Sequence, residues 1–404
     1  MRVAIIGGGA AGMITAYLLN KQGHDVEVFE KSPVLGGNII TLNKNATPNN
    51  SDSDLLLEGG VIEFSNSFVY FKSLLDELDV CYEPVNIGTG VFYKNGAFIL
   101  SSIMSRKNFR GFSLLKSFTK LHLLYLKSIL LGIKLKSISL SKARHLSLKT
   151  LLGKDTTSTN WLKLFMMYSY STDYRLLDDF SSEIALQNIK NYMLAGWFRI
   201  PGGVYTYIEK IIALNNGKFH INSEVRKVLR EDQNVILEIE NGERLLFDKV
   251  VLAIPPHQIL NLLQEPTSEE LFCLQKWKGN KITTIIHQDD SLYKPYPIKR
   301  PSEFDFFETK SGWGYNAILN YLCGIDPLPK YFLSYNLESL IDSRKIIHVA
   351  NHETPLYSQN AVQHRSKLIS LNGHKNTYFA GAWLDDGLHE GATISAMRVA
   401  DLIK

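Results

Sequence analysis

The sequence predicts an α/β protein of two domains, the first of which binds a dinucleotide. Near the N-terminus a glycine-rich turn joins a strand-like apolar run to a helix-like run, and the next strand-like run ends in an acid. The chain has 404 residues, more than one hydrophobic core usually holds. A content of 45% hydrophobic and 21% charged residues is ordinary for a soluble globular protein.

The glycine-rich turn lies within residues 2–17, which read RVAIIGGGAAGMITAY. Gly7, Gly9 and Gly12 have G-x-G-x-x-G spacing, and Ala10 and Ala11 open the following helix. A pyrophosphate at a helix N-terminus is held by free backbone N–H groups and by the positive end of the helix dipole. The first glycine allows the tight turn, the second the approach of phosphate, and the third the packing of helix on strand. Such turns also occur without a ligand, so the context decides.

The context is a second strand over residues 25–29 that ends at Glu30, followed by Lys31. Glu30 lies about 20 residues beyond the glycines, where an acid binds the ribose hydroxyls of a dinucleotide. The alternative is a solvated charge at a strand end. Further glycine pairs, Gly36-Gly37 before Asn38 and Gly59-Gly60 before Val61, indicate that the backbone passes close to a ligand again.

Cysteine and histidine usage argues against disulfides and metals. Cys81, Cys273 and Cys323 are odd in number and widely spaced, so a disulfide framework and a zinc site are not expected. The histidines show no metal-ligand spacing. The N-terminal apolar run is too short for a signal peptide or a membrane span. We expect a cytoplasmic protein, either free or peripheral on a membrane; its oligomeric state is unknown.

The glycine fingerprint, the acid, LGGN and EGGVIEF together resemble the superfamily of FAD-dependent amine oxidases, protoporphyrinogen oxidases and phytoene-type desaturases. More narrowly, the chain is similar to bacterial FAD-binding oxidoreductases associated with fatty-acid modification. The resemblance implies a Rossmann-like, glutathione-reductase-like FAD-binding domain and a mixed α+β substrate domain. At the position of Asn38 the superfamily usually has Arg and the narrower group often His. Asn38 departs from both, so it would not make a charged contact with the FAD phosphates, while the backbone contacts are unaffected.

The resemblance also implies the cofactor, FAD, and the residues that hold it. The predicted cofactor-binding residues are Gly7, Gly9, Ala10, Ala11, Gly12, Glu30, Lys31, Gly36, Gly37, Asn38, Gly59, Gly60, Val61, Val225, Ala253, Gly381, Glu390, Gly391, Ala392 and Thr393. The FAD-binding domain is expected in three segments, 1–66, 200–258 and 345–404. The substrate domain is expected in residues 67–199 and 259–344.

The C-terminal residues carry the more specific half of the resemblance. Residues 377–383, which end in FAGAW, predict a strand that ends in glycine, and a short gap, HEGA and a terminal helix follow. In the family this segment places the flavin ring. His389 and Glu390 are predicted catalytic residues, because an adjacent acid/base pair beside a flavin can move a proton. The alternative for Glu390 is a helix cap or a ribityl ligand. Asp385 and Asp386 stand where the narrower group commonly has a Gly-Tyr pair, and two acids near a flavin would alter the preference for the charge of the substrate.

A basic segment occupies about residues 101–154. Residues 84–154 contain Lys and Arg but no Asp or Glu, and residues 112–135 alternate apolar residues with Lys at helical spacing. Two interpretations stay open: a helix whose cationic face is solvated, or a basic amphipathic helix on an anionic membrane surface. Nucleic acid is a poor third, because no binding motif accompanies the charges.

These features predict an FAD-dependent oxidoreductase that oxidises a C–H bond of a small hydrophobic or lipid-like substrate. Tyr168 and Tyr170 are expected to line its cavity, by resemblance to a W-S-T segment of the narrower group. A second dinucleotide fingerprint is missing, so the substrate would reduce the flavin, and oxygen, a quinone or another carrier would reoxidise it. The alternatives are a flavin-dependent isomerase of unsaturated fatty acids and a non-catalytic FAD-binding regulatory or membrane-adaptor protein.

Overall fold

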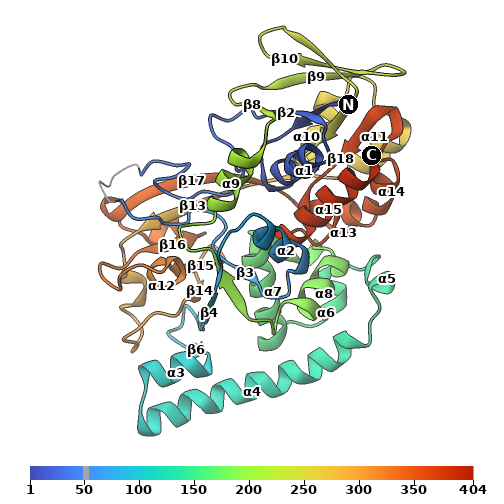
Figure 1. The fold of residues 1–404 in the computed structure, drawn as a ribbon. Helices are drawn as coiled ribbons and strands as arrows, with labels where there is room; N and C mark the ends of the chain where they lie inside the picture. Colours follow the sequence, from blue (N-terminus) through green and yellow to red (C-terminus); the bar gives the residue numbers. More distant parts are fainter. Residues whose placement is uncertain (49–53, 404) are drawn as a thin grey trace.

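The computed structural model describes residues 1–48 and 54–403, and Figure 1 shows two sheets with helices packed around them. The first sheet is parallel and has the strand order β18-β12-β1-β2-β8. Its strands are β1 (Arg2–Ile6), β2 (Asp25–Phe29), β8 (Lys218–His220), β12 (Lys249–Leu252) and β18 (Thr377–Phe379). The predicted glycine turn follows β1 and leads directly into α1 (Ala10–Lys21). The Rossmann-like α/β domain predicted from the sequence is confirmed.

Alternate side chains of β1 enter two different cores, as the two-residue period of a strand requires. Val3 and Ile5 pack with residues of α1 and of the last helix, α15 (His389–Leu402). Ala4 and Ile6 pack with the antiparallel sheet β11-β10-β9. The strands of that sheet are β9 (Val225–Arg230), β10 (Val235–Ile239) and β11 (Arg244–Phe247). The parallel sheet is therefore covered on both faces, as parallel sheets usually are.

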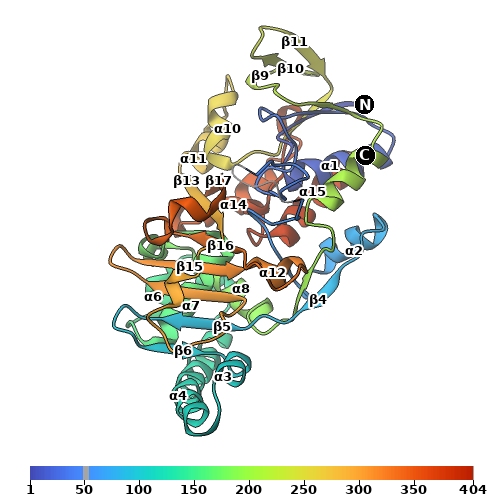
Figure 2. The same ribbon diagram turned by 90° about the vertical axis from the view of Figure 1, so that its left-hand side faces the viewer.

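The second large sheet has seven strands in the order β17-β13-β16-β15-β14-β5-β6. Its strands are β5 (Thr89–Phe92), β6 (Phe98–Leu100), β13 (Gly279–His287), β14 (Phe304–Glu308), β15 (Trp313–Ile318), β16 (Phe332–Tyr335) and β17 (Ile346–Pro355). Figure 2 shows this sheet away from the N-terminal strands. Because β17 pairs with β13 over its whole length, residues 346–355 belong here and not with the FAD-binding segment that was expected to begin at residue 345.

A third, small antiparallel sheet has the strand order β3-β7-β4. It consists of β3 (Phe64–Ser65), β4 (Glu83–Val85) and β7 (Trp197–Arg199). Helix α2 (Val69–Glu77) follows β3 and packs on α15, with Phe71 in the same core as β1. Residues 69–77 therefore pack with the nucleotide-binding half, although the sequence assigned them to the substrate domain.

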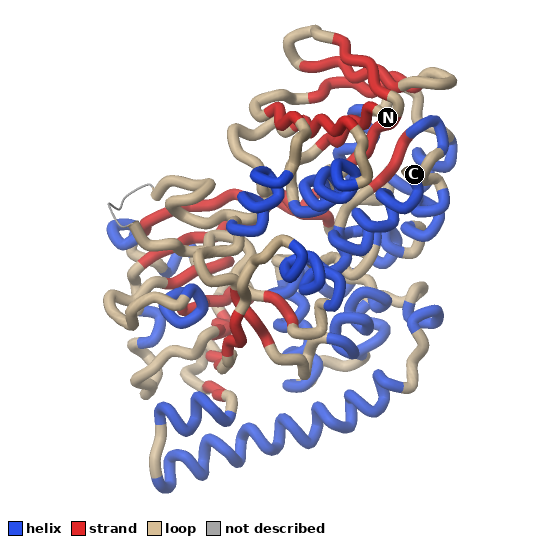
Figure 3. Tube along the Cα trace, in the orientation of Figure 1, coloured by secondary structure: helices blue, strands red, loops and turns tan. Residues whose placement is uncertain are grey.

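The remaining helices pack around the sheets. Figure 3 shows the helices of residues 102–191 in the lower part of the molecule. The helices of this segment are α3 (Ser102–Asn108), α4 (Gly111–Lys136), α5 (Leu140–Ala143), α6 (Leu148–Leu152), α7 (Thr157–Tyr170) and α8 (Ser182–Asn191). The later ones are α9 (Thr206–Leu214), α10 (Pro256–Leu262), α11 (Ser268–Leu274), α12 (Leu319–Cys323), α13 (Gln359–Val362) and α14 (Arg365–Ser370).

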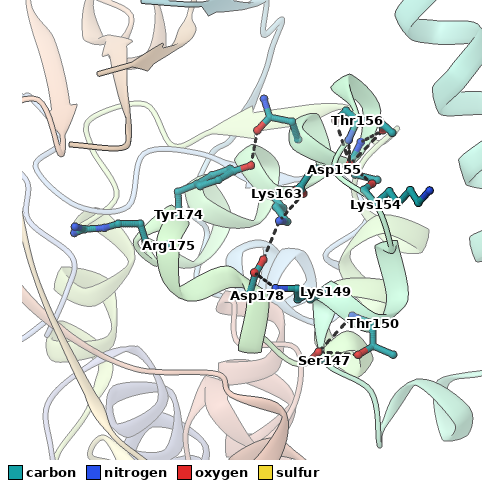
Figure 4. Close-up of polar contacts among 12 residues, drawn as sticks. Ser147, Lys149, Thr150, Lys154, Asp155, Thr156, Lys163, Tyr174, Arg175 and Asp178 are labelled. Carbon is teal, nitrogen blue, oxygen red and sulfur yellow. Dashed lines mark hydrogen bonds and ion pairs between the residues drawn. The ribbon is translucent and has the colours of Figure 1, made fainter. Parts of the chain in front are cut away.

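A buried lysine anchors α7 (Figure 4). Nζ of Lys163 lies 3.0 Å from a carboxylate oxygen of Asp155 and 2.8 Å from one of Asp178, and Asp178 also pairs with Lys149 of α6 at 3.1 Å. Burial alone would lower the pKa of Lys163, but the hydrogen bonds to Asp178 and Asp155 outweigh burial and raise it. The charged network therefore fixes α7 against α6 and the 3₁₀ turn Tyr174–Asp179.

Candidate functional site

One cavity of about 1060 Å³ has walls from both large sheets. Glu30 and Val225 belong to its nucleotide-side wall, while Tyr315 and Tyr357 belong to its substrate-side wall. The predicted cofactor residues that line it are Gly7, Gly9, Ala10, Ala11, Glu30, Lys31, Gly36, Gly37, Asn38, Gly60, Val61, Val225, Ala253, Gly381 and Ala392. Segments that are far apart in the sequence therefore meet at a single space.

The first turn of α1 faces this cavity with its backbone. No described side chain caps the helix at Gly9, and its first turn holds no acid. The Gly36-Gly37 pair lies against the same turn: Gly36 N donates to Gly8 O at 2.8 Å, and a Cβ on Gly37 would come within 3.0 Å of the Gly9 Cα. Free N–H groups and the positive end of the helix dipole are therefore presented to whatever fills the cavity.

Gly12 does not line the cavity, although it belongs to the fingerprint. A Cβ at this position would lie 1.9 Å from the carbonyl oxygen of Gly7 and 3.2 Å from the Cβ of Ala253. Its missing side chain lets α1 pack on the ends of β1 and β12, which is the packing role expected for the third glycine.

Glu30 ends β2 and faces the cavity from a buried position. Its carboxylate accepts hydrogen bonds from Gly8 N and Ser32 N, each at 2.8 Å. These two bonds fix the side chain beside the glycine turn, where it faces the cavity together with Lys31 and Val225. Each carboxylate oxygen keeps a further lone pair that can accept a ribose hydroxyl.

The Gly59-Gly60 pair is held by the seven-stranded sheet. Gly59 does not line the cavity, and its carbonyl oxygen accepts a hydrogen bond from Thr284 Oγ1 at 2.5 Å. A Cβ on Gly60 would lie 2.1 Å from the carbonyl oxygen of Asn38. Asn38 Nδ2 in turn donates to the carbonyl oxygen of Glu353 at 3.2 Å. Only a glycine at position 60 allows these two backbone segments to approach so closely at the cavity wall.

The loop before α15 is organised by Asp386. This buried carboxylate accepts hydrogen bonds from Tyr192 Oη at 2.7 Å, Leu388 N at 2.8 Å and Gly391 N at 2.9 Å. Burial raises the pKa of Asp386 to about 6. Neither Asp385 nor Asp386 lines the cavity. The side chain of Asp386 holds the loop, and that of Asp385 lies 3.6 Å from the Arg398 guanidinium of α15. Gly391 and Thr393 also lie behind the wall.

Glu390 is placed away from the cavity, against the sequence prediction. Its carboxylate oxygens accept hydrogen bonds from the backbone N–H groups of Val69, Tyr70 and Phe71 at 2.9, 3.0 and 2.9 Å. These are the first N–H groups of α2, which no residue of that helix caps. Glu390 therefore caps α2 and ties it to α15, which is the helix-cap alternative, and its carboxylate is held by the backbone of α2 outside the cavity lining.

His389 does line the cavity, next to the rings of Phe64, Phe71 and Tyr207 at centroid distances of 4.9, 5.2 and 6.1 Å. Its buried Nε2 has no hydrogen-bond partner among the described residues. Burial lowers the pKa of His389 to about 4, so the ring is neutral at physiological pH. His389 can exchange a hydrogen bond with a ligand there, but it offers no positive charge.

Sequence reasoning missed Glu63, a buried acid in the cavity wall at the start of β3. Neither carboxylate oxygen has a hydrogen-bond partner among the described residues, and burial raises the pKa of Glu63 to about 8. A buried carboxyl group without a partner is costly, which makes it a candidate functional group. The available signal was a single acid between apolar residues in EGGVIEF.

Tyr168 and Tyr170 face the cavity as expected, together with Tyr192, Tyr315, Tyr357 and Trp383. The hydroxyl of Tyr170 donates to the carbonyl oxygen of Asp386 at 2.9 Å, so its ring rather than its hydroxyl is offered to the cavity. We call the space between these side chains and Glu63 the aromatic chamber. Because its walls are large rings, it suits an apolar ligand.

The cavity fits a dinucleotide cofactor. It joins an uncapped helix start, an acid at the end of the second strand, and glycine positions with no room for a side chain. Unpartnered polar atoms on His389 and Trp383 lie further along the same space. Fold and cavity together define a dinucleotide-binding α/β protein whose cavity continues into the aromatic chamber.

A comparison with protein-family models gives the particular family. The model of the flavin-containing amine oxidoreductases matches residues 10–282. This match covers more than half of the chain, so the protein belongs to that family, and its cofactor is FAD. Residues 10–282 include most of the predicted cofactor contacts.

Comparisons with curated proteins give only short matches. Achacin of Lissachatina fulica is 36% identical over 89 residues, which are 22% of this chain and 16% of that protein. An uncharacterised protein from the nifH2 3' region of Methanothermococcus thermolithotrophicus is 47% identical over 36 residues, 9% of this chain and 35% of that one. The chain thus matches well under two thirds of the length of these relatives.

Solved structures share the fold over the full length. Cyclohexylamine oxidase from Brevibacterium oxydans IH-35A has a TM-score of 0.73 at 13% identity, covering 100% of this chain and 98% of that chain. A CLA-producing fatty acid isomerase from P. acnes has a TM-score of 0.71 at 15% identity and coverages of 100% and 97%. Putrescine oxidase has 0.69 at 15% identity, with coverages of 100% and 99%.

Proposed function

We propose that the chain is an FAD-dependent oxidoreductase that oxidises a C–H bond of a hydrophobic, lipid-like substrate. One observation carries this proposal: the cavity that contains the dinucleotide cradle continues into the aromatic chamber. A substrate in the chamber would lie next to the cofactor and be shielded from water, as a hydride transfer requires.

The residues of the chain would divide the work along the cavity. The first turn of α1 and the Gly36-Gly37 pair would hold the pyrophosphate, and Glu30 the ribose hydroxyls. Bound FAD supplies the hydride-accepting chemistry. The aromatic side chains would hold an apolar substrate and exclude water, and neutral His389 would place a hydrogen bond in the same space.

Glu63 favours a polar group on that substrate, and an amine in particular. At neutral pH the carboxyl group is protonated and can donate a hydrogen bond to an uncharged oxygen or nitrogen. A substrate ammonium group beside it would favour the ionised carboxylate and pair with it. Oxidation of a hydrophobic amine is therefore the second candidate, and putrescine oxidase and cyclohexylamine oxidase share the fold.

Anaerobic mixing tests the proposal. The FAD-loaded protein would be mixed with a hydrophobic amine and, separately, with a long-chain unsaturated fatty acid. We expect one of them to bleach the flavin and to yield a product that has lost two electrons. An isomerised fatty acid with the flavin still oxidised would contradict oxidation and favour the isomerase.

The variant Glu63→Gln separates the two substrate candidates. If the substrate is an amine, KM for the amine should rise while an uncharged analogue with the same apolar body is unaffected. Equal effects on both would contradict ion pairing at Glu63.

A further inference from the structure

Helix α4 carries an apolar face that the rest of the protein leaves uncovered. The side chain of Phe112 is 81% exposed, that of Leu130 63% and that of Ile133 64%. Leu115, Leu123, Leu126 and Ile129 are exposed as well. Their spacing of mostly three or four residues places them in one stripe along the 26-residue helix.

The opposite face of α4 is the one that packs on the protein. Leu121, Leu124 and Leu135 are buried, and the helix contacts α3, β6 and α7. Figures 1 and 2 show α4 along the lower edge of the molecule, from the side and nearly end-on. A helix that is packed on one side normally turns polar residues to water on the other. Here the outward face is apolar instead, which indicates that something covers it.

Four lysines follow this stripe along one flank. Lys116, Lys120, Lys127 and Lys134 are all exposed, and none forms an ion pair with a described residue. Lys120 makes a cation–π contact instead, with its Nζ 5.5 Å from the centre of the Phe98 ring. The spacing from Lys116 to Lys120 and from Lys127 to Lys134 keeps these charges on the same side of the helix.

Four of the cations that lie outside α4 in the acid-free segment, residues 84–154, do form ion pairs. Lys94, Lys107, Arg144 and Lys149 pair with acids from other parts of the chain, at 3.8, 3.1, 3.2 and 3.1 Å. The fold therefore neutralises part of the acid-free segment but leaves the charges beside the exposed apolar stripe free.

We propose that α4 lies on an anionic membrane surface, with its exposed apolar stripe in the interface and its lysines against lipid headgroups. A face with both features matches such a surface, because apolar burial and attraction to anionic lipid act together. In residues 1–48 and 54–403, no helix is long and apolar enough to cross a bilayer, so α4 would lie on the membrane. Helix α7 packs on α4, and its last residues line the cavity, so the aromatic chamber would lie close to a lipid source.

Vesicle co-sedimentation of the full-length, FAD-loaded protein tests this inference. The vesicles are phosphatidylcholine with and without phosphatidylglycerol, at low and high salt. We expect binding to the anionic vesicles only, weakened by salt because screening shortens the range of the attraction. Replacing Lys116, Lys120 and Lys127 with Gln should weaken binding on the order of 100-fold. Equal binding to both vesicle types, or binding to neither, would overturn the proposal.

Matched variants separate this surface from general effects. Leu126→Ser, Leu130→Ser and Ile133→Ser together should also abolish binding, while the same change at the exposed Leu194, Leu214 and Leu246 should not. Lys294, Lys299 and Lys310, changed to Gln, serve as the charge control. Retained flavin absorbance reports that each variant is folded.

The sedimentation coefficient without vesicles tests whether a second copy of this chain, instead of a membrane, covers the apolar stripe of α4. A wild-type dimer that the triple Ser variant converts to a monomer would mean that a second copy covers α4, and would overturn the proposal. None of these measurements uses a substrate, so a failure here is distinct from a failure of the proposed oxidation.

Discussion

Glu63 is the residue that most clearly separates this cavity from a plain apolar one. It is buried, faces the aromatic chamber and has no described hydrogen-bond partner. Burial penalises its charged form, which is why its pKa rises from 4.5 to about 8. A folded protein keeps such a group only where other interactions offset its cost, and functional sites are the usual place.

The first prediction concerns stability against pH. The folded-state pKa of Glu63 lies above its unfolded value, so the folded state binds the proton more tightly between pH 4.5 and about 8. Stability from this group is full below the unfolded pKa and is lost as pH rises through the folded one. Glu63→Gln has no proton to lose, so its free energy of unfolding should not fall with pH in this way. Its advantage over wild type should grow from near zero at pH 4.5 to roughly 3–5 kcal/mol at pH 8.

Urea unfolding of the two proteins from pH 5 to pH 9 measures this difference. Glu58 has a similarly raised pKa but is present in both proteins, so its effect cancels. Glu243→Gln, at an exposed carboxylate, is the control and should follow wild type. A difference between wild type and Glu63→Gln that does not change with pH would show that Glu63 is charged in the folded state.

The second prediction uses two helical glycines. A Cβ on Gly12 would meet the carbonyl oxygen of Gly7 at 1.9 Å, whereas one on Gly132 of α4 would meet nothing within 4 Å. Gly12→Ala should cost at least about 2 kcal/mol and release FAD, because backbone must move. Gly132→Ala should be neutral or stabilising by up to about 1 kcal/mol. Thermal unfolding and the flavin retained after gel filtration measure both, and an unaffected Gly12→Ala protein would contradict this packing.

At the scale of elements, Glu390 shows how one side chain joins two helices. It lies in the first turn of α15 and caps α2, which lies more than three hundred residues earlier in the chain. Three hydrogen bonds to its side-chain oxygens satisfy N–H groups that α2 would otherwise leave without partners. The predicted catalytic pair, His389 and Glu390, is therefore divided: one residue faces the cavity and the other holds the helix behind it.

The third prediction follows from this cap. Glu390→Ala should lower the free energy of unfolding by about 3 kcal/mol, because the start of α2 loses its acceptors. The flavin spectrum should be unchanged, since the carboxylate is not in the cavity. Glu77→Ala at the exposed end of the same helix breaks a surface ion pair with Lys21 and a hydrogen bond from Tyr17 Oη, and should cost no more than about 2 kcal/mol. A large change in the flavin spectrum of Glu390→Ala would place Glu390 at the cofactor after all.

Elements with strong local signals were predictable from the sequence. The glycine turn with α1 and the long helix of the basic segment both have signals that lie within a few neighbouring residues. The pairing of β17 with β13 has none, because a strand's partner is set by the whole sheet. For that reason the domain boundary predicted at residue 345 differs from the structure, in which residues 346–355 belong to the seven-stranded sheet.

The site was predictable only where glycine or strand-end position marks it. Gly37 and Gly60 are recognisable because glycine alone allows such close backbone approach. Glu63 is not, because a missing partner is a property of the folded surroundings. Asp386 is a similar case, since its partner Tyr192 lies 194 positions away in the sequence.

At the scale of the whole molecule, three surfaces are joined through shared elements. Helix α1 and the glycine pairs form the nucleotide side of the cavity, and the seven-stranded sheet contributes to the opposite wall. Helix α7 has its last residues in the aromatic chamber and its outer side on α4, which carries the exposed apolar stripe. The two proposals made above, a hydrophobic substrate and a membrane surface on α4, would both connect to the flavin site through α7.

The central claim is that this one cavity holds FAD along its length. The most direct measurement is to purify the protein, denature it, and identify and quantify the nucleotide released. We predict FAD in equal amount to the protein, and its absence from a Gly12→Ala preparation. Release of FMN or a nicotinamide nucleotide instead, or a colourless protein that does not take up added FAD, would contradict the account.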